Sequence, residues 1–318
     1  MGQVLVAVGG NSLIRAGQRG TVAEQVENIR QTAAQLAEIA ALGNSLVITH
    51  GNGPQVGAQL LRSEAGSSQT YSQPLDICVA ATQGEIGYVL QNALQSELGK
   101  RGITAPVVTM ITQVKVNRDD PAFSSPSKPI GPFYHKEDAE HKRDELGWQI
   151  LDDAARGYRR VVPSPEPEAI VEIDAIRKCV ENNIIVIAVG GGGIPVFEKD
   201  ANIQGVEAVI DKDKSSALLA NEMGFPVLMI STDVEFVYVH FKHSDQKAIR
   251  EMTPSQAEEY LGAGEFSRGS MGPKIEAALE FIRRGGKEVI ITDPVHLAQS
   301  LTGESGTHIR KPSAGGGK

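Results

Sequence analysis

Three short apolar runs in this chain each lead directly into a cluster of glycines. These segments are residues 4–10, 45–57 and 184–193. Continuous apolar runs of this length are typical of strands that are buried on both faces of a parallel sheet. In such sheets ligands bind at the carboxyl ends of the strands, where glycine lets backbone N–H groups approach a small anion. The pattern predicts a sheet with a ligand site along one edge.

Helical patterns at residues 23–42, 83–98 and 170–182 alternate with apolar runs. This alternation predicts an α/β fold, in which a mostly parallel sheet is covered by helices on both faces. At 318 residues the chain can bury a large core, either as one α/β unit or as two lobes. The composition changes at about 115–165, where a proline-rich stretch precedes a charged one. We expect a protruding subdomain there.

Opposite charges alternate over residues 211–214, Asp-Lys-Asp-Lys, directly before a helical pattern at 215–220. A lysine beside a fixed carboxylate stays protonated and oriented, and a helix N-terminus adds N–H groups and positive dipole for an anion. Phosphoryl transfer requires this combination, with Lys212 and Asp213 as candidate residues. Taken alone, the segment is also consistent with a solvated charged turn.

A further lysine follows a glycine-rich loop at residues 269–274. Pro273 suits the first helical position and Gly285 the far end, so the loop is expected to open a helix with Lys274 in its first turn. A lysine there would attract phosphate oxygens. The alternative is a helix stop followed by an ordinary surface helix.

Residues 120–134 contain four prolines, one glycine and three aromatic residues. The prolines argue against a regular element, while the apolar content is too high for a free linker. We expect an ordered excursion over a site, on which Lys128 would enter the cleft when the loop closes. The alternative is an irregular packing lobe with Lys128 in water.

Standard nucleotide-binding motifs are missing from the sequence. Val56 stands where the pattern G-x-G-x-x-G, read from Gly51 and Gly53, requires its last glycine, and no G-x-x-x-x-G-K-[ST] occurs. If ATP binds to this chain, it binds without a Walker P-loop.

Bulk properties narrow the class of partner and the compartment. A net charge of −8 and a pI near 5.5 argue against nucleic acid. The chain has no signal-like start and no run of 18 apolar residues, so we expect neither secretion nor membrane spanning.

Cys78 and Cys179 are expected to be free thiols in a reducing cytoplasm, without metal-ligand neighbours. His50 is expected to be structural rather than a base.

Motif-sized segments of the chain match one known family. They are residues 8–11, 49–57, 74–76 with 82–88, 128–134, 159–165, 190–193, 211–213, 232–234 and 269–274. In this order, across nearly the whole chain, they resemble carbamate kinase, a member of the amino acid kinase family. The sequence departs from the family at Ser127, where threonine is usual, and at residues 241–246, where a glycine-lysine-proline loop is usual.

The resemblance implies a three-layer α/β/α sandwich formed by residues 1–318 as a single domain. Its N-terminal lobe, about 1–168, would include the protruding subdomain and bind carbamate, and its C-terminal lobe, about 169–318, would bind nucleotide. The implied reaction is reversible phosphoryl transfer between ATP and carbamate, giving ADP and carbamoyl phosphate. It often serves ATP synthesis in arginine or related nitrogen catabolism.

Residue roles follow from the patterns together with the resemblance. Catalytic roles are expected for Lys128, Lys212, Asp213 and Lys274. Carbamate is expected to bind at Gly9, Gly10, Asn11, Gly51, Asn52 and Gly53. Nucleotide is expected to contact Lys212, Thr232, Asp233, Tyr238, Met271 and Lys274. Mg²⁺ would arrive with the nucleotide rather than on protein ligands, and a homodimer is expected to bury the apolar stripe of residues 83–98.

Two other functions fit parts of the sequence. Another amino acid kinase could use the same C-terminal lobe on a different carboxylate or on a nucleotide monophosphate, although the Lys128 segment and the Arg159-Arg160 pair argue against it. A catalytically silent metabolite sensor is the second alternative. The full set of three candidate lysines and Asp213 argues against a silent protein.

Overall fold

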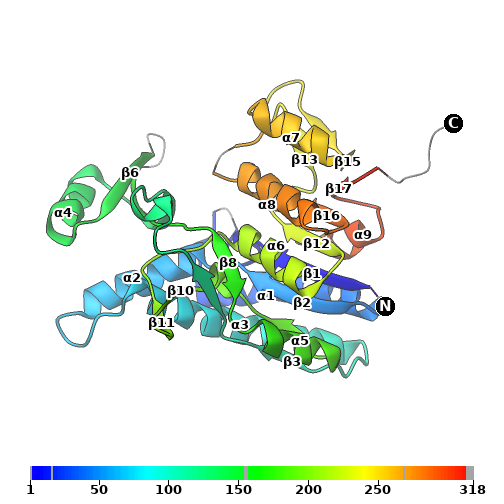
Figure 1. The fold of residues 1–318 in the computed structure, drawn as a ribbon, viewed down its shortest axis with the longest axis horizontal. Coiled ribbons are helices and arrows are strands. Elements are labelled where there is room, and N and C mark those ends of the chain that lie inside the picture. The colour runs from blue at the N-terminus through cyan, green and yellow to red at the C-terminus, as the bar shows by residue number, and fades with distance from the viewer. Residues whose placement is uncertain (1, 16, 154–156, 268, 313–318) are drawn as a thin grey trace.

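The computed structural model describes residues 2–15, 17–153, 157–267 and 269–312 of the chain (Figure 1). An eight-stranded sheet forms its centre, in the order β15-β17-β16-β12-β1-β2-β9-β3. Neighbouring strands are parallel except for the pair β16 and β17. The strands are β1 (Gln3–Val8), β2 (Ser45–His50), β3 (Val107–Thr109), β9 (Ile185–Ile187), β12 (Val227–Ser231), β15 (Glu251–Met252), β16 (Glu288–Thr292) and β17 (Thr307–Arg310). The expected α/β class with a mostly parallel sheet is confirmed.

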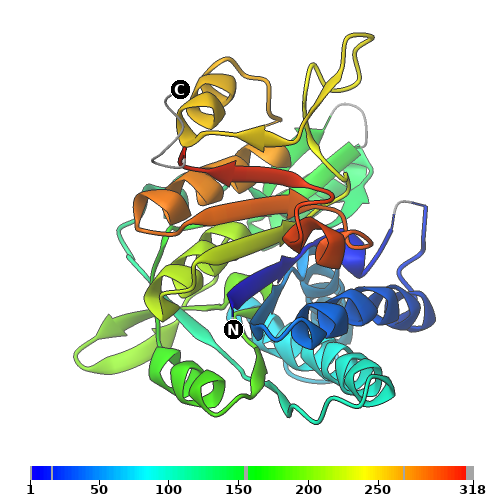
Figure 2. The same ribbon diagram turned by 90° about the vertical axis from the view of Figure 1, so that its right-hand side faces the viewer.

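Helices cover both faces of this sheet (Figures 1 and 2). One face packs against α1 (Val22–Ala41), α3 (Leu75–Lys100) and α9 (Leu297–Leu301). The other packs against α5 (Ile173–Glu181), α6 (Lys212–Met223), α7 (Pro254–Gly262) and α8 (Met271–Arg283). Among the described helices, none is long and apolar enough to cross a membrane.

Strand β1 shows why the sequence of a central strand is apolar throughout. Val4, Val6 and Val8 lie in the core shared with α1 and α3, whereas Leu5 and Ala7 lie in the core on the opposite face. Side chains alternate between the two faces of a strand, so a sheet covered on both sides requires an apolar residue at every position. The three-layer α/β/α sandwich follows directly from this two-sided burial.

A second sheet of four strands lies beside the main one, in the order β11-β10-β4-β8. Its strands are β4 (Gln113–Val116), β8 (Pro167–Ile170), β10 (Ile194–Lys199) and β11 (Asn202–Gly205). Strands from before and after residue 168 therefore share this sheet, and β9 lies between β2 and β3. Because strands on both sides of residue 168 are hydrogen-bonded in one sheet, the strand pairing does not mark a lobe boundary there. The division into two lobes near residue 168 stays a prediction.

The protruding subdomain contains the three-stranded sheet β5-β7-β6 and helix α4. Figure 1 shows α4 and β6 at the left of the molecule, away from the central sheet. The elements are β5 (Lys128–Tyr134), α4 (Lys136–Leu146), β6 (Gln149–Asp153) and β7 (Gly157–Val162). They lie within the range expected for a subdomain.

The expectation of an irregular proline segment is wrong for its second half, because β5 is a strand. Lys128 pairs with Val162 and Pro129 with Val161 of β7. Proline cannot donate to a ladder, and it is therefore confined to edge strands and bulges. β5 meets both conditions, since it is an edge strand of its sheet and its register shifts between Ile130 and Tyr134.

The apolar stripe of α3 faces the interior of the chain rather than a partner. Ile86, Leu90, Leu94 and Leu98 are all at most 2% exposed and pack in the core with α1 and the sheet. The stripe is therefore not the surface of a dimer. Tyr88, on the same helix, is 68% exposed.

Candidate active site

The two N-terminal glycine turns lie side by side at one edge of the sheet. The first, residues 9–11, follows β1, and the second, residues 51–53, follows the adjacent parallel strand β2. Gly9 passes so close to the end of β12 that a side chain there would overlap the carbonyl oxygen of Ser231. The turns and the end of β12 therefore form one continuous edge of closely approaching backbone.

Helix α6 brings its N-terminus to this edge. Asp211 caps the helix, and its carboxylate accepts a hydrogen bond of 2.9 Å from the N–H of Asp213. Such a cap satisfies N–H groups that have no partner within the first turn. The side chain of Lys212 passes over the second glycine turn, because a Cβ on Gly51 would lie 3.4 Å from its Cδ.

Asp213 holds two lysines on one buried carboxylate. Its Oδ1 lies 2.5 Å from Nζ of Lys212, and its Oδ2 accepts a hydrogen bond of 3.0 Å from Nζ of Lys274. The residue is 3% exposed. Burial alone would raise the pKa of Asp213, but the two ammonium groups outweigh it and hold the pKa below its usual range. Asp213 is therefore ionised and fixes both lysines in place.

Lys128 reaches the same place from the protruding subdomain. Its Nζ donates a hydrogen bond of 2.6 Å to Oδ2 of Asp211, whose other oxygen caps α6. Burial would raise the pKa of Asp211, but Lys128 and then Lys212 and Lys274 lower it. Lys128 was expected to enter the cleft when a loop closes, yet in this structure it is already paired inside it.

The three lysines with Asp211 and Asp213 are called the charge cluster below. Three ammonium groups and two carboxylates leave one positive charge in excess, which suits an anion. Asp211 is the member that sequence reasoning did not select as a site residue. An aspartate directly before a helical pattern is the usual signal of an N-cap, and that signal was present.

Helix α8 begins two residues earlier than Pro273 indicated. Its first residue is Met271 and its N-cap is Ser270. Pro273 is the third residue, where the missing N–H removes no helical hydrogen bond. Lys274, the fourth residue, still faces Asp213 from the start of the helix.

The third glycine cluster packs against the second turn rather than facing a ligand. A side chain on Gly190 would overlap the ring of His50, and one on Gly191 would overlap the amide of Asn52. Asn52 is 3% exposed and donates a hydrogen bond of 2.8 Å to Thr82. Its side chain thus holds the turn in place, and the binding of carbamate at Asn52 stays a prediction.

His50 is buried beneath the second turn. Burial lowers the pKa of His50 to about 4, and its Nδ1 lies 3.0 Å from the carbonyl oxygen of Gly51. The imidazole is neutral near pH 7 and makes a local hydrogen bond. This geometry supports the structural role expected for it.

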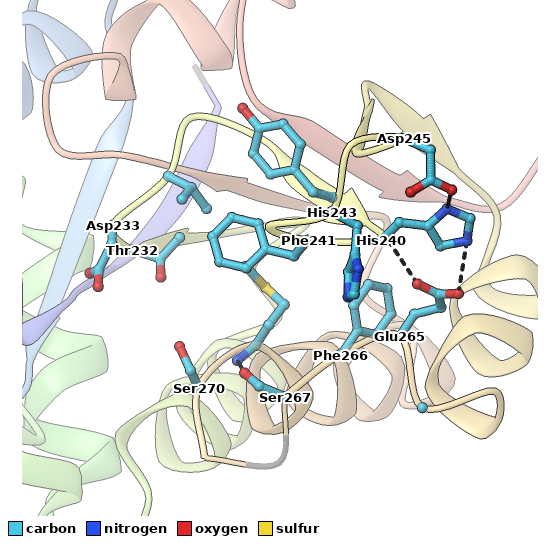
Figure 3. A pocket seen from close by; sticks show the side chains of 14 residues that line it. Thr232, Asp233, His240, Phe241, His243, Asp245, Glu265, Phe266, Ser267 and Ser270 are labelled. Carbon is cyan, nitrogen blue, oxygen red and sulfur yellow. Dashed lines mark hydrogen bonds and ion pairs between the residues drawn. The ribbon is translucent and has the colours of Figure 1, made fainter. Parts of the chain in front are cut away.

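A cavity of about 650 Å³ opens at the start of α8, the helix that carries Lys274 (Figure 3). Thr232 and Asp233, which follow β12, line one side, and Met271 at the start of α8 lines another. Tyr238 belongs to β13 (Val237–Val239), which pairs with β14 (Lys247–Ile249). All four residues that sequence reasoning assigned to the nucleotide alone therefore lie around this one cavity.

Other parts of the cavity wall were not predicted from the sequence. The additional lining residues include His240, Phe241, His243, Asp245, Glu265 and Phe266. Figure 3 shows His240 held between two carboxylates, with Nδ1 2.6 Å from Asp245 and Nε2 3.3 Å from Glu265. The available signal was the departure from the family pattern at residues 241–246, of which Phe241, His243 and Asp245 lie in this wall.

Several known proteins that are similar to this chain over nearly its whole length are carbamate kinases of the amino acid kinase family. The profile of the Amino acid kinase family matches residues 2–293. The carbamate kinase of Pyrococcus horikoshii is 49% identical, over 96% of this chain and 98% of its own length. That of Thermococcus kodakarensis is 47% identical, over 97% of this chain and 99% of its own. A structure of carbamate kinase from Giardia lamblia bound to AMP-PNP superposes with a TM-score of 0.91 at 38% identity, covering 98% of this chain and 99% of that one.

Proposed function

This chain belongs to the amino acid kinase family, and we infer that it is a carbamate kinase, which transfers a phosphoryl group reversibly between ATP and carbamate. The observation that carries this inference is the charge cluster. Three lysines from separate elements meet at the N-terminus of α6, where Lys212 passes over the second glycine turn. A cavity of about 650 Å³ opens at the start of α8, the helix that carries Lys274. Phosphoryl transfer depends on placing two anions in line and neutralising their charge, which is what such a cluster can do.

The proposed division of labour follows the elements that carry the lysines. Lys212 and Lys274 neutralise the transferring phosphoryl group, and Asp213 keeps both ammonium groups oriented. Lys128 acts on the carbamate side. Carbamate already carries a nucleophilic carboxylate oxygen, so no strong general base is needed. The neutral, buried His50 is therefore not proposed to act as a base.

Carbamate is proposed to bind at the two glycine turns, residues 9–11 and 51–53, where backbone approaches closely and Lys212 passes overhead. The adenine and ribose of the nucleotide are proposed to occupy the large cavity. Its aromatic wall includes Tyr238 and Phe241, whose ring centroids lie 5.9 Å apart. An aromatic surface of this kind suits a planar base.

Mg²⁺ is proposed to accompany the nucleotide. Within the described residues there is no group of three or more His, Cys, Asp or Glu side chains that could hold a metal ion. Three carboxylates line the cavity, and the one closest in sequence to β12 is that of Asp233. This donor set fits an ion carried mainly by phosphate oxygens, which would supply charge neutralisation there.

A homodimer is proposed through the outer face of α3. Ile77 and Tyr88 are 46% and 68% exposed and lie eleven positions apart, which is about three helical turns and places them on one face. Both cysteines are free, as expected from the sequence.

Two further expectations stay predictions. They are a cytoplasmic location and a role in arginine or related nitrogen catabolism.

The deciding experiment is an assay that couples ATP formation to a visible signal, with ADP and carbamoyl phosphate as substrates. We expect magnesium-dependent turnover with carbamoyl phosphate and little with other acyl phosphates, such as acetyl phosphate. Turnover with another acyl phosphate alone would indicate a different carboxylate kinase. Binding of ADP without turnover on any of them would indicate a metabolite sensor.

A further inference from the structure

Helix α2 (Gly53–Gly66) and strand β5 cross at a contact between two glycines. A Cβ on Gly57 would overlap Cα of Gly131 and lie 2.5 Å from its backbone nitrogen. No side chain fits between the two backbones at this point. Glycine inside a helix is destabilising relative to alanine, so its presence at position 57 calls for a packing reason. The crossing supplies that reason.

The strand is also fixed at this point by its own conformation and by a second contact. Gly131 has a φ of +70°, in the left-handed region that glycine adopts readily. Its carbonyl oxygen accepts a hydrogen bond of 2.8 Å from Nε of Arg159 on β7. Gly131 is thus held by two contacts, one with the backbone of Gly57 and one with the side chain of Arg159.

Both elements at the crossing lead directly to the site. Helix α2 begins at Gly53, the last residue of the second glycine turn, and Gly57 lies about one helical turn further on. Strand β5 begins at Lys128, three residues before Gly131, and Lys128 donates to Asp211 at 2.6 Å. The crossing therefore sets the distance between the strand that carries Lys128 and the helix that follows the second turn.

We propose that Gly57 is a positioning residue, whose close backbone contact with Gly131 determines how far Lys128 reaches into the charge cluster. This role rests on the proposed function of Lys128 at the carbamate side. A side chain at position 57 would push β5 away from α2 and withdraw the ammonium group. Displacement of a reacting group by about 1 Å can cost on the order of 10²-fold in rate.

The first test is Gly57→Ala, with Gly66→Ala as the matched control. Gly66 is the last residue of the same helix, and a Cβ there meets the Thr70 methyl at an ordinary 3.6 Å. We expect kcat/KM for carbamoyl phosphate to fall about 10²-fold in Gly57→Ala. The KM for ADP should change less than about twofold, and Gly66→Ala should behave as wild type. A rise in the KM for ADP as large as the loss in kcat/KM for carbamoyl phosphate would overturn the proposal.

A double-mutant cycle separates positioning from general packing. If Gly57 acts through Lys128, then Gly57→Ala should cost almost nothing further in a protein that already carries Lys128→Ala. Multiplicative losses in the double variant would overturn the proposal. Should Gly57→Ala not fold, Arg159→Ala replaces it in the same cycle, because it releases Gly131 without introducing a clash.

A chemical readout makes the test independent of turnover. Lys128 is labelled with an amine-acetylating reagent and followed by mass spectrometry. The internal reference is Lys115 on β4, which is half-buried and paired with Glu198, a contact that Gly57→Ala does not touch. Its Nζ is paired with Asp211 in the wild-type protein, so we expect several-fold faster labelling of Lys128 in Gly57→Ala. Unchanged labelling would reject the positioning role. Wild-type inactivity with carbamoyl phosphate would instead reject the proposed function, while the labelling result would still decide where Gly57 places Lys128.

Discussion

At the scale of single residues, the site depends on two aspartates that differ in what they hold. Asp213 binds two lysines and is almost fully buried, whereas Asp211 joins Lys128 to the N-terminus of α6. Buried charges are costly unless each is paired, and loss of one partner leaves the other uncompensated. The lysines are therefore held in place before any ligand arrives, and incoming phosphate oxygens find them already oriented.

Replacement of either lysine on Asp213 should impair the chemical step. We expect Lys212→Ala and Lys274→Ala each to lower kcat by about 10²-fold or more while the fold persists, because a contact to developing charge is lost. Lys214→Ala is the control, since Lys214 pairs with Glu166 instead. Steady-state kinetics and circular dichroism check this. Near-wild-type turnover in either site variant would contradict the role of the charge cluster.

Lys128→Ala should distinguish the two substrates. We expect a loss of about 2–4 kcal/mol in transition-state stabilisation with carbamoyl phosphate, and little change in ADP binding, because the proposed nucleotide cavity does not include Lys128. Lys115→Ala, which removes an exposed pair with Glu198, is the control. A lower melting temperature with unchanged kcat/KM would mean that Lys128 serves packing alone.

His50 should make the protein sensitive to acid. Its pKa is about 4 in the folded state against 6.5 when unperturbed, so the unfolded chain binds a proton first as the pH falls. The free energy of unfolding should thus fall by about 3 kcal/mol between pH 7 and pH 4 because of this one group. Urea unfolding at both pH values measures it. In His50→Gln the loss should be smaller by that amount, and an equal loss in both proteins would exclude His50 as its source.

At the scale of elements, each part of the site is placed by the end of a helix or strand. α6 and α8 bring Lys212 and Lys274 at their N-termini, the ends of β1 and β2 bring the glycine turns, and β5 brings Lys128 at its first residue. Helix α3 has a different part. It carries no proposed catalytic residue, and its apolar stripe supports the sheet from the opposite face.

Truncation of the α3 stripe should cost stability rather than activity. Leu94 is fully buried, so Leu94→Ala should lower the free energy of unfolding by about 2–5 kcal/mol. Leu42→Ala is the matched control, because Leu42 is 54% exposed and the same change should stay within about 0.5 kcal/mol. Urea denaturation measures both. Equal values for the two variants would argue against the stripe as a core element.

At the scale of the whole molecule, the charge cluster joins regions far apart in sequence. Lys128 and Asp211 lie 83 positions apart, and Lys274 and Asp213 lie 61 apart. The two glycine turns come from the first 53 residues. The site therefore exists only when the protruding subdomain, the central sheet and the helices of the C-terminal part are all in place.

The exposed face of α3 predicts the state of assembly. We expect a homodimer in solution, with twice the chain mass of 33.9 kDa by light scattering at micromolar concentration. Tyr88→Arg should shift it toward monomer by placing a charge in an apolar contact, while Lys115→Ala should not. A wild-type monomer at that concentration would refute the dimer, and a dimer unaffected by Tyr88→Arg would place the contact elsewhere.

The sequence by itself determined the α/β class, the glycine-ended strands and the positions of Lys212 and Lys274 in the first turns of two helices, because these are local signals. Buried strands require apolar residues at every position, and a helix N-terminus attracts capping carboxylates and anions. The residues around the large cavity were found in part, since Thr232, Asp233 and Met271 lie in segments shared with the family. Its remaining wall lay in the segment that departs from the family.

Only the tertiary structure decided how these parts meet. That Lys128 begins an edge strand, that Asp211 holds it, and that Asn52 bonds Thr82 all depend on partners at least 30 positions away in sequence. The α3 stripe was also ambiguous, because a buried stripe reads the same whether the sheet or a second chain covers it. Sequence periodicity reports which face of a helix is apolar, and packing alone decides what lies against that face.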